Sequence, residues 1–158
     1  MNYWLMKSEP SEYGIEDLER EPAGRGYWDG VRNYQARNFI RAMMPGDRAF
    51  FYHSSCPKPG ISGIMRIVSR AWPDPGQFDP DDPHYDPKSS VENPRWSLVE
   101  VAFEKRFTPL LCLQRLRETN ELDDMLILRR GNRLSVTPVT IQQWHCIERM
   151  MHANNNKK

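Results

Sequence analysis

The residues best suited to chemistry lie between positions 27 and 37, where a tryptophan, a turn glycine, two arginines and an asparagine occur close together. Apolar residues recur at helical spacing directly after Asn33, which predicts a helix from about residue 34 to residue 44 with Asn33 as its N-cap. Trp28 then lies in a loop beside free backbone N–H groups. Such a place suits a planar ligand stacked on the indole, with an anion near the helix start. A plainer interpretation, in which Trp28 is a core anchor and Asn33 only a cap, fits the spacing equally well.

Other flat rings and hydrogen-bonding side chains fall near predicted strand ends and loops. Stacking on an aromatic ring contributes about 1–3 kcal/mol per base, whereas extracting a base from a duplex costs a few kcal/mol. One ring alone is therefore insufficient, but two rings and several hydrogen bonds to the base edge could hold an extracted base. The rings are Trp28, Tyr52, Trp72 and Tyr85, and the polar groups are Ser8, Asn33, His53 and Ser54.

The charge of the chain is unevenly distributed. Its formal net charge is +1, but residues 73–87 carry five aspartates and no Lys or Arg, so the remainder carries +1 plus 5, or +6. A moderately basic body is compatible with sequence-independent phosphate contacts but does not require them. The arginines that could make such contacts are Arg25, Arg32, Arg37, Arg129, Arg130 and Arg133.

Several other chemistries fit the sequence poorly. Phosphate-loop and dinucleotide motifs are absent, and we expect no cofactor. The acidic run with Asp79, Asp81, Asp82 and His84 lacks the glycine and final glutamate of a calcium loop, so we expect no metal site. Ser54 or Cys56 could act as a nucleophile with a neighbouring histidine. However, adjacent residues on a strand point to opposite faces, so His53 and Ser54 do not form a dyad without help.

Composition and pattern predict one α+β domain. A chain of 158 residues is long enough for a proper core. Three widely spaced cysteines without a CxxC pair indicate reduced thiols inside the cell. The N-terminus has no apolar run as long as that of a signal peptide, and no apolar run approaches the length of a membrane span. Five or six strands with short helices between them favour a small, strongly bent sheet or barrel.

The expected elements follow from period-two and helical patterns, capping residues and prolines. Strands are predicted at residues 2–7, 48–54, 61–72, 95–107 and 134–136. Helices are predicted at residues 15–20 and 34–44, from Thr108-Pro109 onward, and after a capping box at Thr140-Ile141-Gln142-Gln143 with Ile141, Trp144, Ile147 and Met151 buried. Residues 73–94 form a long loop rich in Pro and Asp, of a kind that is usually functional or disordered.

Several ordered segments closely resemble the EVE domain family, and the resemblance covers nearly the whole chain. The most specific are Trp4-Leu5-Met6-Lys7-Ser8-Glu9-Pro10, the stretch from Trp28 to Arg37, Phe51-Tyr52-His53-Ser54 and Arg133-Leu134-Ser135-Val136. Shorter matches are Trp72-Pro73-Asp74, Tyr85-Asp86-Pro87, Pro94-Arg95-Trp96 and Pro138-Val139.

The resemblance implies a PUA-like fold related to YTH and ASCH domains: a small β-barrel of five to six strands with peripheral helices. We expect a single domain over residues 1–152 and a flexible tail over 153–158. The resemblance also implies a non-catalytic reader of a modified base in DNA or RNA, with modified cytosine such as 5-methylcytosine in DNA as the leading candidate. Trp28 would form one wall of an aromatic cage, and either Trp72 or Tyr85 the other.

The working hypothesis assigns two sets of residues. The base-binding pocket would comprise Ser8, Glu9, Trp28, Asn33, Tyr52, His53, Ser54, Trp72 and Tyr85. Flanking phosphates would contact Arg32, Arg37 and Arg133. We expect a monomer with a nucleic-acid partner and no membrane association, located in the cytoplasm of a bacterium or the nucleus of a eukaryote.

Two alternatives belong to other functional classes. An enzyme acting on a modified nucleobase or nucleotide would use His53 and Glu9 as general acid and base, which requires both groups to reach one substrate. A protein-interaction domain would keep only a vestigial pocket without a basic rim.

Overall fold

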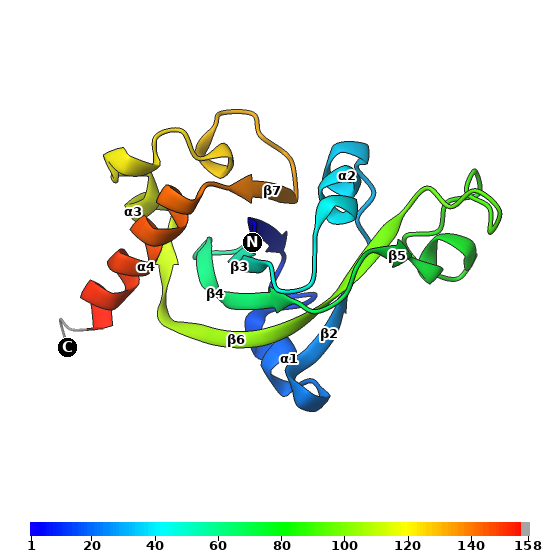
Figure 1. Cartoon of the computed structure of the whole chain (residues 1–158), viewed down its shortest axis with the longest axis horizontal. Coiled ribbons are helices and arrows are strands. Elements are labelled where there is room, and N and C mark those ends of the chain that lie inside the picture. Colours follow the sequence, from blue (N-terminus) through cyan, green and yellow to red (C-terminus); the bar gives the residue numbers. More distant parts are fainter. Residues whose placement is uncertain (156–158) are drawn as a thin grey trace.

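A computed structural model describes residues 1–155, with an α+β architecture in which one mixed sheet is covered by helices (Figure 1). The strands are β1 (Tyr3–Ser8), β2 (Arg25–Trp28), β3 (Arg48–His53), β4 (Gly60–Ile67), β5 (Trp72–Pro73), β6 (Ser97–Cys112) and β7 (Val136–Val139). The helices are α1 (Ile15–Arg20), α2 (Tyr34–Ala42), α3 (Leu113–Arg117) and α4 (Ile141–Asn155), with 3-10 turns at Pro22–Gly24, Pro75–Phe78, Asn120–Leu122 and Leu126–Leu128.

The sheet is strongly curved but open. Its strand order is β2-β6-β4-β3-β1-β7, and the two-residue β5 pairs with the start of β6. Only the β1–β3 pair is parallel among the strand pairs of the described residues. In Figure 1 the long strand β6 curves below β3 and β4, and helix α1 extends lower still. The prediction of a bent α+β sheet is confirmed, whereas the strand number was underestimated and the path ends at β2 and β7 instead of closing into a barrel.

The two faces of the sheet carry separate cores. Phe51 of β3 lies in one core with residues of α1 and α2, including Ile15 and Ile40. Phe50 and Tyr52, its neighbours on the strand, lie in the other core with residues of α3 and α4. This alternation follows from the period of two in a β-strand, and it determines which side chains can reach the site described below.

Three helix starts were read correctly from their capping residues. Asn33 Oδ1 accepts a 3.0 Å hydrogen bond from the N–H of Ala36 at the start of α2. The N–H of Gly14 donates to Asp17 at the start of α1. Thr140 and Gln143 form the predicted reciprocal capping box of α4. Each pair provides an acceptor for a backbone N–H group that the start of a helix leaves without a partner.

Several boundaries differ from the sequence prediction. Residues 108–112 continue β6 instead of starting a helix, because Leu111 and Cys112 pair with Ile61 and Gly60 of β4. The predicted strand at 61–72 is divided into β4 and β5, and Trp28, which was expected in a loop, is the last residue of β2. These outcomes depend on strand partners far away in the sequence, which local patterns do not encode.

The C-terminal part also differs from its prediction. Strand β7 covers residues 136–139 instead of 134–136. Ile141, expected on the buried face of α4, is 50% exposed. Residues 153–155 are helical, and the rest of the predicted tail, 156–158, lies outside the described residues.

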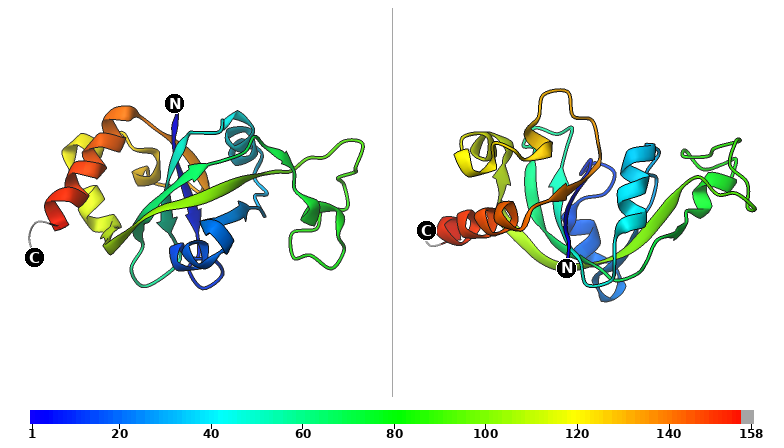
Figure 2. Two further views of the ribbon diagram at one scale, coloured as in Figure 1. Left: turned by 60° about the horizontal axis from the view of Figure 1, so that its bottom comes forward. Right: turned by 45° about the horizontal axis from the view of Figure 1, so that its top comes forward.

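The segment from 73 to 94 is organised around one buried amide and projects beyond the end of the sheet (Figure 2). The Gln77 side chain is fully buried, and its Nε2 donates to the carbonyls of Asp74 and Trp96. Its Oε1 accepts from the N–H groups of Arg95 and Trp96. Asp86 accepts a 2.7 Å hydrogen bond from Trp96 Nε1. Because buried polar groups need partners, this network gives the segment a defined path without a hydrophobic core of its own.

Candidate functional site

A cavity of about 650 Å³ opens where β1 ends, beside the edge strand β2 and the loop that leads into α2. Its walls come from residues 7–8, 12–13, 21, 27–33 and 135. We call it the Trp28 cavity. It brings together Ser8, Trp28, Arg32 and Asn33 from the predicted site residues, which are up to 25 positions apart in the sequence.

Trp28 forms part of the cavity wall and belongs at the same time to the core. Only 6% of its surface is exposed, and its ring meets Phe51 edge-on with the ring centroids 5.1 Å apart. The two interpretations of Trp28 that the spacing left open are therefore compatible. The core contact fixes the ring in place, and the remaining surface faces the cavity.

Lys7 and Ser8, at the end of β1, supply polar groups on another wall. The Ser8 hydroxyl donates a 2.7 Å hydrogen bond to the carbonyl of Tyr13, which fixes the turn that follows β1. Lys7 is half-buried, and burial lowers the pKa of its ammonium group from the ordinary value. Within residues 1–155, no carboxylate forms an ion pair with Lys7. A hydrogen-bond donor thus faces the cavity without an ion-pair partner among the described residues.

Acidic groups complete the polar lining. Burial raises the pKa of the Asp29 carboxyl, and the nearby charge of Asp74 raises it further. The Tyr13 hydroxyl donates to Glu21 at 3.2 Å, and burial together with that carboxylate raises the pKa of Tyr13. Glu12 is an exposed member of the wall. The cavity therefore offers both a cationic donor and anionic acceptors, the set needed to recognise a ligand whose edge alternates between donors and acceptors.

Arg32 lines the cavity, but its guanidinium group is held by the protein. Nη1 forms a 3.0 Å ion pair with the buried Asp74, and Nε donates to the carbonyl of His84 at 2.8 Å. The same carboxylate accepts from the N–H of Gly30. Gly30 has φ of +76°, and a Cβ there would approach the His84 ring to about 3 Å, so only glycine fits. Arg32 thus links the loop at residues 29–33, which we call the cavity loop, to the 73–94 segment.

Six predicted members of the pocket lie outside the cavity wall, and four of them are described first. Tyr52 is buried in the core on the other face of the sheet, because it follows Phe51 directly on β3, and burial raises its pKa to about 12. Glu9 is exposed in the turn after β1. Trp72 and Tyr85 are 38% and 41% exposed and line no part of this cavity.

His53 and Ser54 serve the backbone instead. His53 Nε2 accepts a 3.1 Å hydrogen bond from the N–H of Ile15, which requires an unprotonated nitrogen, and burial lowers the pKa of the imidazole. The N–H of Ser54 donates to the carbonyl of Ser8. Because neither His53 nor Glu9 reaches the Trp28 cavity, the acid–base pair of the enzyme alternative is not assembled there.

Arg37 and Arg133, the other two predicted phosphate contacts, differ in how far their side chains are held by the protein. Arg37 donates to the carbonyl of Arg95 at 3.1 Å, and its guanidinium lies 4.8 Å from the centre of the Tyr34 ring. Arg133 is exposed in the loop before Ser135, a member of the cavity wall. Of these two arginines, Arg133 is the more exposed.

Sequence reasoning overlooked several lining residues. Lys7 belongs to the motif Lys7-Ser8-Glu9, but no role was given to its side chain. Asp29 and Val31 follow Trp28 directly, and their proximity to it was the available signal. Tyr13 had no such signal, because it reaches the cavity only through the turn that Ser8 stabilises.

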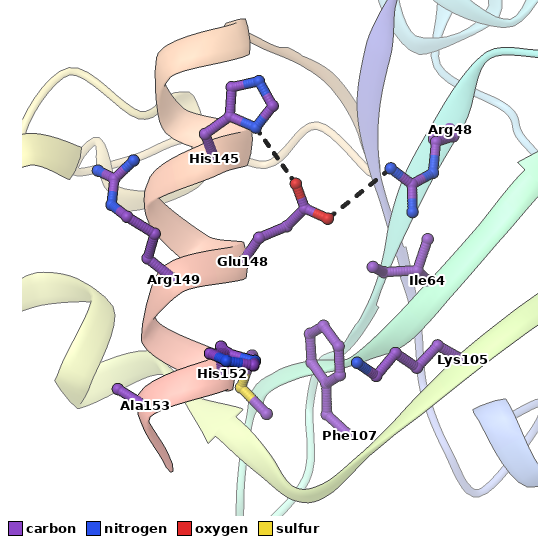
Figure 3. Close-up of a pocket in the computed structure, with 10 residues that line it drawn as sticks. Arg48, Ile64, Lys105, Phe107, His145, Glu148, Arg149, His152 and Ala153 are labelled. Atoms are coloured by element: carbon purple, nitrogen blue, oxygen red, sulfur yellow. Dashed lines mark hydrogen bonds and ion pairs between the residues drawn. The ribbon is translucent and has the colours of Figure 1, made fainter. Parts of the chain in front are cut away.

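A second cavity, of about 730 Å³, lies between α4 and strands β3, β4 and β6 (Figure 3). We call it the α4 cavity. Most of its charged groups are paired, but the exposed Lys105 forms no ion pair among the described residues. Glu148 lies 3.8 Å from Arg48 and 3.3 Å from His145. Arg48 also pairs with Glu104, and Arg149 pairs with Glu121 at 2.8 Å. This cavity is larger than the Trp28 cavity, and its lysine without an ion pair among the described residues, Lys105, is exposed, whereas Lys7 is half-buried.

Residues 1–155 contain neither a cluster of metal-ligating side chains nor a membrane-spanning helix. No group of three or more His, Cys, Asp or Glu side chains is arranged to hold a metal ion. No helix in this range is long and apolar enough to cross a membrane.

Comparison with known proteins gives matches over almost the full chain. The family model described as EVE domain matches residues 2–150. Human thymocyte nuclear protein 1 is 46% identical over 160 residues, which cover 90% of this chain and 71% of that protein. The structure of the human THYN1 protein in complex with DNA containing 5-methylcytosine is 42% identical, with a TM-score of 0.91, and the match covers 96% of this chain and 98% of that chain. A YTH domain from Zygosaccharomyces rouxii shares the fold, with a TM-score of 0.55 at 11% identity over 95% of this chain and 86% of that chain.

Proposed function

Because this chain belongs to the EVE domain family, we propose that it is a nucleic-acid-binding module that recognises a modified base in the Trp28 cavity. Modified cytosine in DNA is the first ligand class to test, since a human relative of the same fold was crystallised with DNA that contains 5-methylcytosine. Modified RNA is the second ligand class. The observation that carries the proposal is a cavity with an aromatic wall and free polar groups of both kinds.

The lining of the cavity matches the edge of cytosine. Cytosine offers an amino donor at N4 and acceptors at N3 and O2, and proteins that extract a base read this edge by hydrogen bonds. The Lys7 ammonium can donate to an acceptor, and the Asp29 carboxylate can accept from the amino group. Val31, buried at 5% exposure in the wall, offers an apolar surface to a methyl group at C5. A volume of about 650 Å³ accommodates one nucleotide.

Trp28 supplies the stacking surface in this proposal. Stacking on one ring contributes about 1–3 kcal/mol, which is comparable with the cost of removing a base from a duplex. A single-stranded or already unpaired base is therefore the preferred form of the ligand. Since Trp28 is only 6% exposed, a base that covers its ring must displace neighbouring side chains of the 29–33 loop.

The exposed loop from 129 to 133 supplies the phosphate contacts. Arg129, Arg130 and Arg133 are exposed and precede the cavity residue Ser135. They form no ion pairs within the described part of the chain. Arg32 and Arg37, by contrast, would have to give up contacts inside the protein to bind a phosphate. We therefore assign Arg32 to the support of the cavity loop and Arg37 to a contact between α2 and Arg95, and we retain Arg133 as a phosphate contact.

Binding titrations with matched oligonucleotides test the proposal. Single strands of DNA and RNA with one central cytosine, either unmodified or 5-methylated, are compared at two salt concentrations. We expect a preference for the modified base that persists when salt is raised, since phosphate contacts alone weaken steeply with salt. Trp28→Ala should remove that preference, whereas Lys7→Met should weaken binding of both bases, because both carry the acceptor to which Lys7 donates. Uniform binding that disappears with salt, or an undiminished preference in Trp28→Ala, would contradict the assignment.

The cellular setting and the assembly state belong to the same proposal. We expect a monomer, testable by light scattering with and without oligonucleotide. We also expect a nuclear location in a eukaryote, which the name of the human relative supports, or a cytoplasmic one in a bacterium.

A further inference from the structure

Part of the sheet carries arginines and aromatic rings outside both cavities. Arg25 of β2 and Arg66 of β4 are both register partners of Ala102 of β6. Residues directly opposite one another in a sheet project from the same face. The two arginines therefore flank one small residue on one face, and both are exposed.

Two aromatic residues continue this face toward the end of β6. Tyr27 pairs with Glu100, and Trp72 pairs with Leu98. Because Leu98, Glu100 and Ala102 are two residues apart, they lie on the same face of β6. We call the surface formed by Arg25, Tyr27, Arg66 and Trp72 the open sheet face.

The rings of the open sheet face are accessible. Tyr27 is 61% exposed and Trp72 is 38% exposed. Their ring centroids are 5.7 Å apart with an angle of 84° between the planes. This T-shaped contact holds both rings in position and leaves surface on which a base can stack.

The charge of the open sheet face favours an anionic partner. Arg25 and Arg66 form no ion pair within residues 1–155, in contrast to Arg48 and Arg106, which are paired with glutamates. Glu100, half-buried between the rings and the arginines, opposes them, so the face retains a net charge of +1 from two arginines and one glutamate. Exposed rings beside unpaired arginines are the combination that binds single-stranded nucleic acid.

The open sheet face adjoins the Trp28 cavity through β2. Strand β2 is the edge of the sheet, and Tyr27 belongs both to this face and to the cavity lining. Strands β2 and β5 approach β6 in its right-hand half in Figure 1. A single strand of nucleic acid that leaves the cavity therefore reaches the rings of Tyr27 and Trp72 by crossing the edge of β2.

We propose that the open sheet face binds the nucleotides adjacent to the base held in the Trp28 cavity. A single strand stacks its flanking bases on Tyr27 and Trp72, and its phosphates contact Arg25 and Arg66. This proposal rests on the proposed function, because it assumes that a strand is anchored by a base in the cavity. It also gives Trp72 a role as a platform for a neighbouring base, in place of a wall of the pocket.

The test compares two ligands of different length. One is the mononucleotide 5-methyl-2′-deoxycytidine 5′-monophosphate, and the other is a single-stranded DNA of about nine nucleotides with the same base at its centre, a length within the range of single-strand platforms. The variants are Trp72→Ala and Arg66→Ala, neither of which changes a residue of the cavity lining. Arg117→Ala, at an exposed arginine of α3, is the control.

We expect Trp72→Ala and Arg66→Ala to weaken binding of the oligonucleotide by about five- to tenfold and to leave mononucleotide binding unchanged. Arg66→Ala should also reduce the slope of log affinity against log salt by about 0.7. Trp72→Phe should restore most of the affinity, and Arg117→Ala should have no effect. Unchanged oligonucleotide binding in both alanine variants would overturn the proposal, as would an equal loss for the two ligands.

Failure of the underlying function would be visible separately. A wild-type protein without preference for the modified base would contradict base reading in the Trp28 cavity. A selective loss of oligonucleotide affinity in Trp72→Ala would even then support strand binding by the open sheet face.

Discussion

The Trp28 cavity and the α4 cavity differ in how their charges are balanced. In the α4 cavity Glu148 is shared by Arg48 and His145, and Lys105, the lysine without an ion pair among the described residues, is exposed to solvent. In the Trp28 cavity Lys7 has no ion pair within the described residues, and burial shifts the pKa values of Lys7 and Asp29 away from their ordinary ranges. Perturbed groups that face a cavity without partners are typical of binding sites. The larger cavity is therefore the weaker candidate, and size alone would have selected it.

The largest effect is expected from Trp28→Ala. Removal of a buried tryptophan lowers the free energy of unfolding by about 3–5 kcal/mol, and the preference for a modified base should disappear. Denaturant unfolding and oligonucleotide titration measure the two effects separately. Trp28→Phe, which keeps an aromatic ring against Phe51, is the control for loss of the fold. If Trp28→Ala kept the preference for the modified base, the Trp28 cavity would no longer be favoured over the α4 cavity as the binding site.

Lys7→Met should lower the affinity for a modified cytosine about tenfold, the loss typical of a hydrogen bond to a charged donor. The wild-type affinity should also fall at alkaline pH. Because burial lowers the pKa of Lys7, the charged form is lost as pH rises through a value below the ordinary 10.5. Titrations between neutral and alkaline pH should show this decline in the wild type and a flat profile in Lys7→Met. Identical profiles would show that the Lys7 charge takes no part in binding.

Glu148→Gln tests the α4 cavity, because it removes one charge there as Lys7→Met does in the Trp28 cavity. It removes the carboxylate that Arg48 and His145 share, and the free energy of unfolding should fall by about 0.2–1 kcal/mol, as is usual for exposed ion pairs. Binding of modified oligonucleotides should not change. If Glu148→Gln altered base preference, the assignment of the two cavities would be reversed.

The smallest effect concerns His53 and appears only as a pH dependence of stability. His53 must be neutral to accept the hydrogen bond from Ile15, and burial lowers its pKa below 6.5 in the folded protein. The unfolded chain therefore binds a proton first as pH falls, so stability is full above pH 6.5 and decreases toward the folded-state pKa. His53→Gln, whose side-chain oxygen can still accept a hydrogen bond, should flatten this decrease in denaturation curves recorded at several pH values. An unchanged slope would contradict the assignment.

The sequence predicted best what depends on local chemistry. Asn33 was recognised as a helix cap because its position before an apolar periodicity determines its role. The α+β class and the EVE resemblance were likewise readable from pattern and motif. Strand β2 was missed because its pairing with β6 joins residues more than 70 positions apart.

The candidate site was predictable only in part, for the same reason. Ser8, Trp28 and Asn33 flank the cavity as expected, whereas Tyr52 is on the wrong face of β3 for it. The error arose because nearness to a strand end does not reveal the face of the sheet on which a ring lies. His53 was expected at the pocket because the sequence does not reveal its hydrogen-bond partner. That partner is the N–H of Ile15, 38 residues away.

The most direct test of the central claim is a crystal structure of the protein with a single-stranded oligonucleotide that contains 5-methylcytosine. The account predicts the modified base inside the Trp28 cavity, with a polar atom of Lys7 or Asp29 within hydrogen-bond distance of its edge. Density for the base in the α4 cavity, or a strand bound with every base outside the Trp28 cavity, would contradict it.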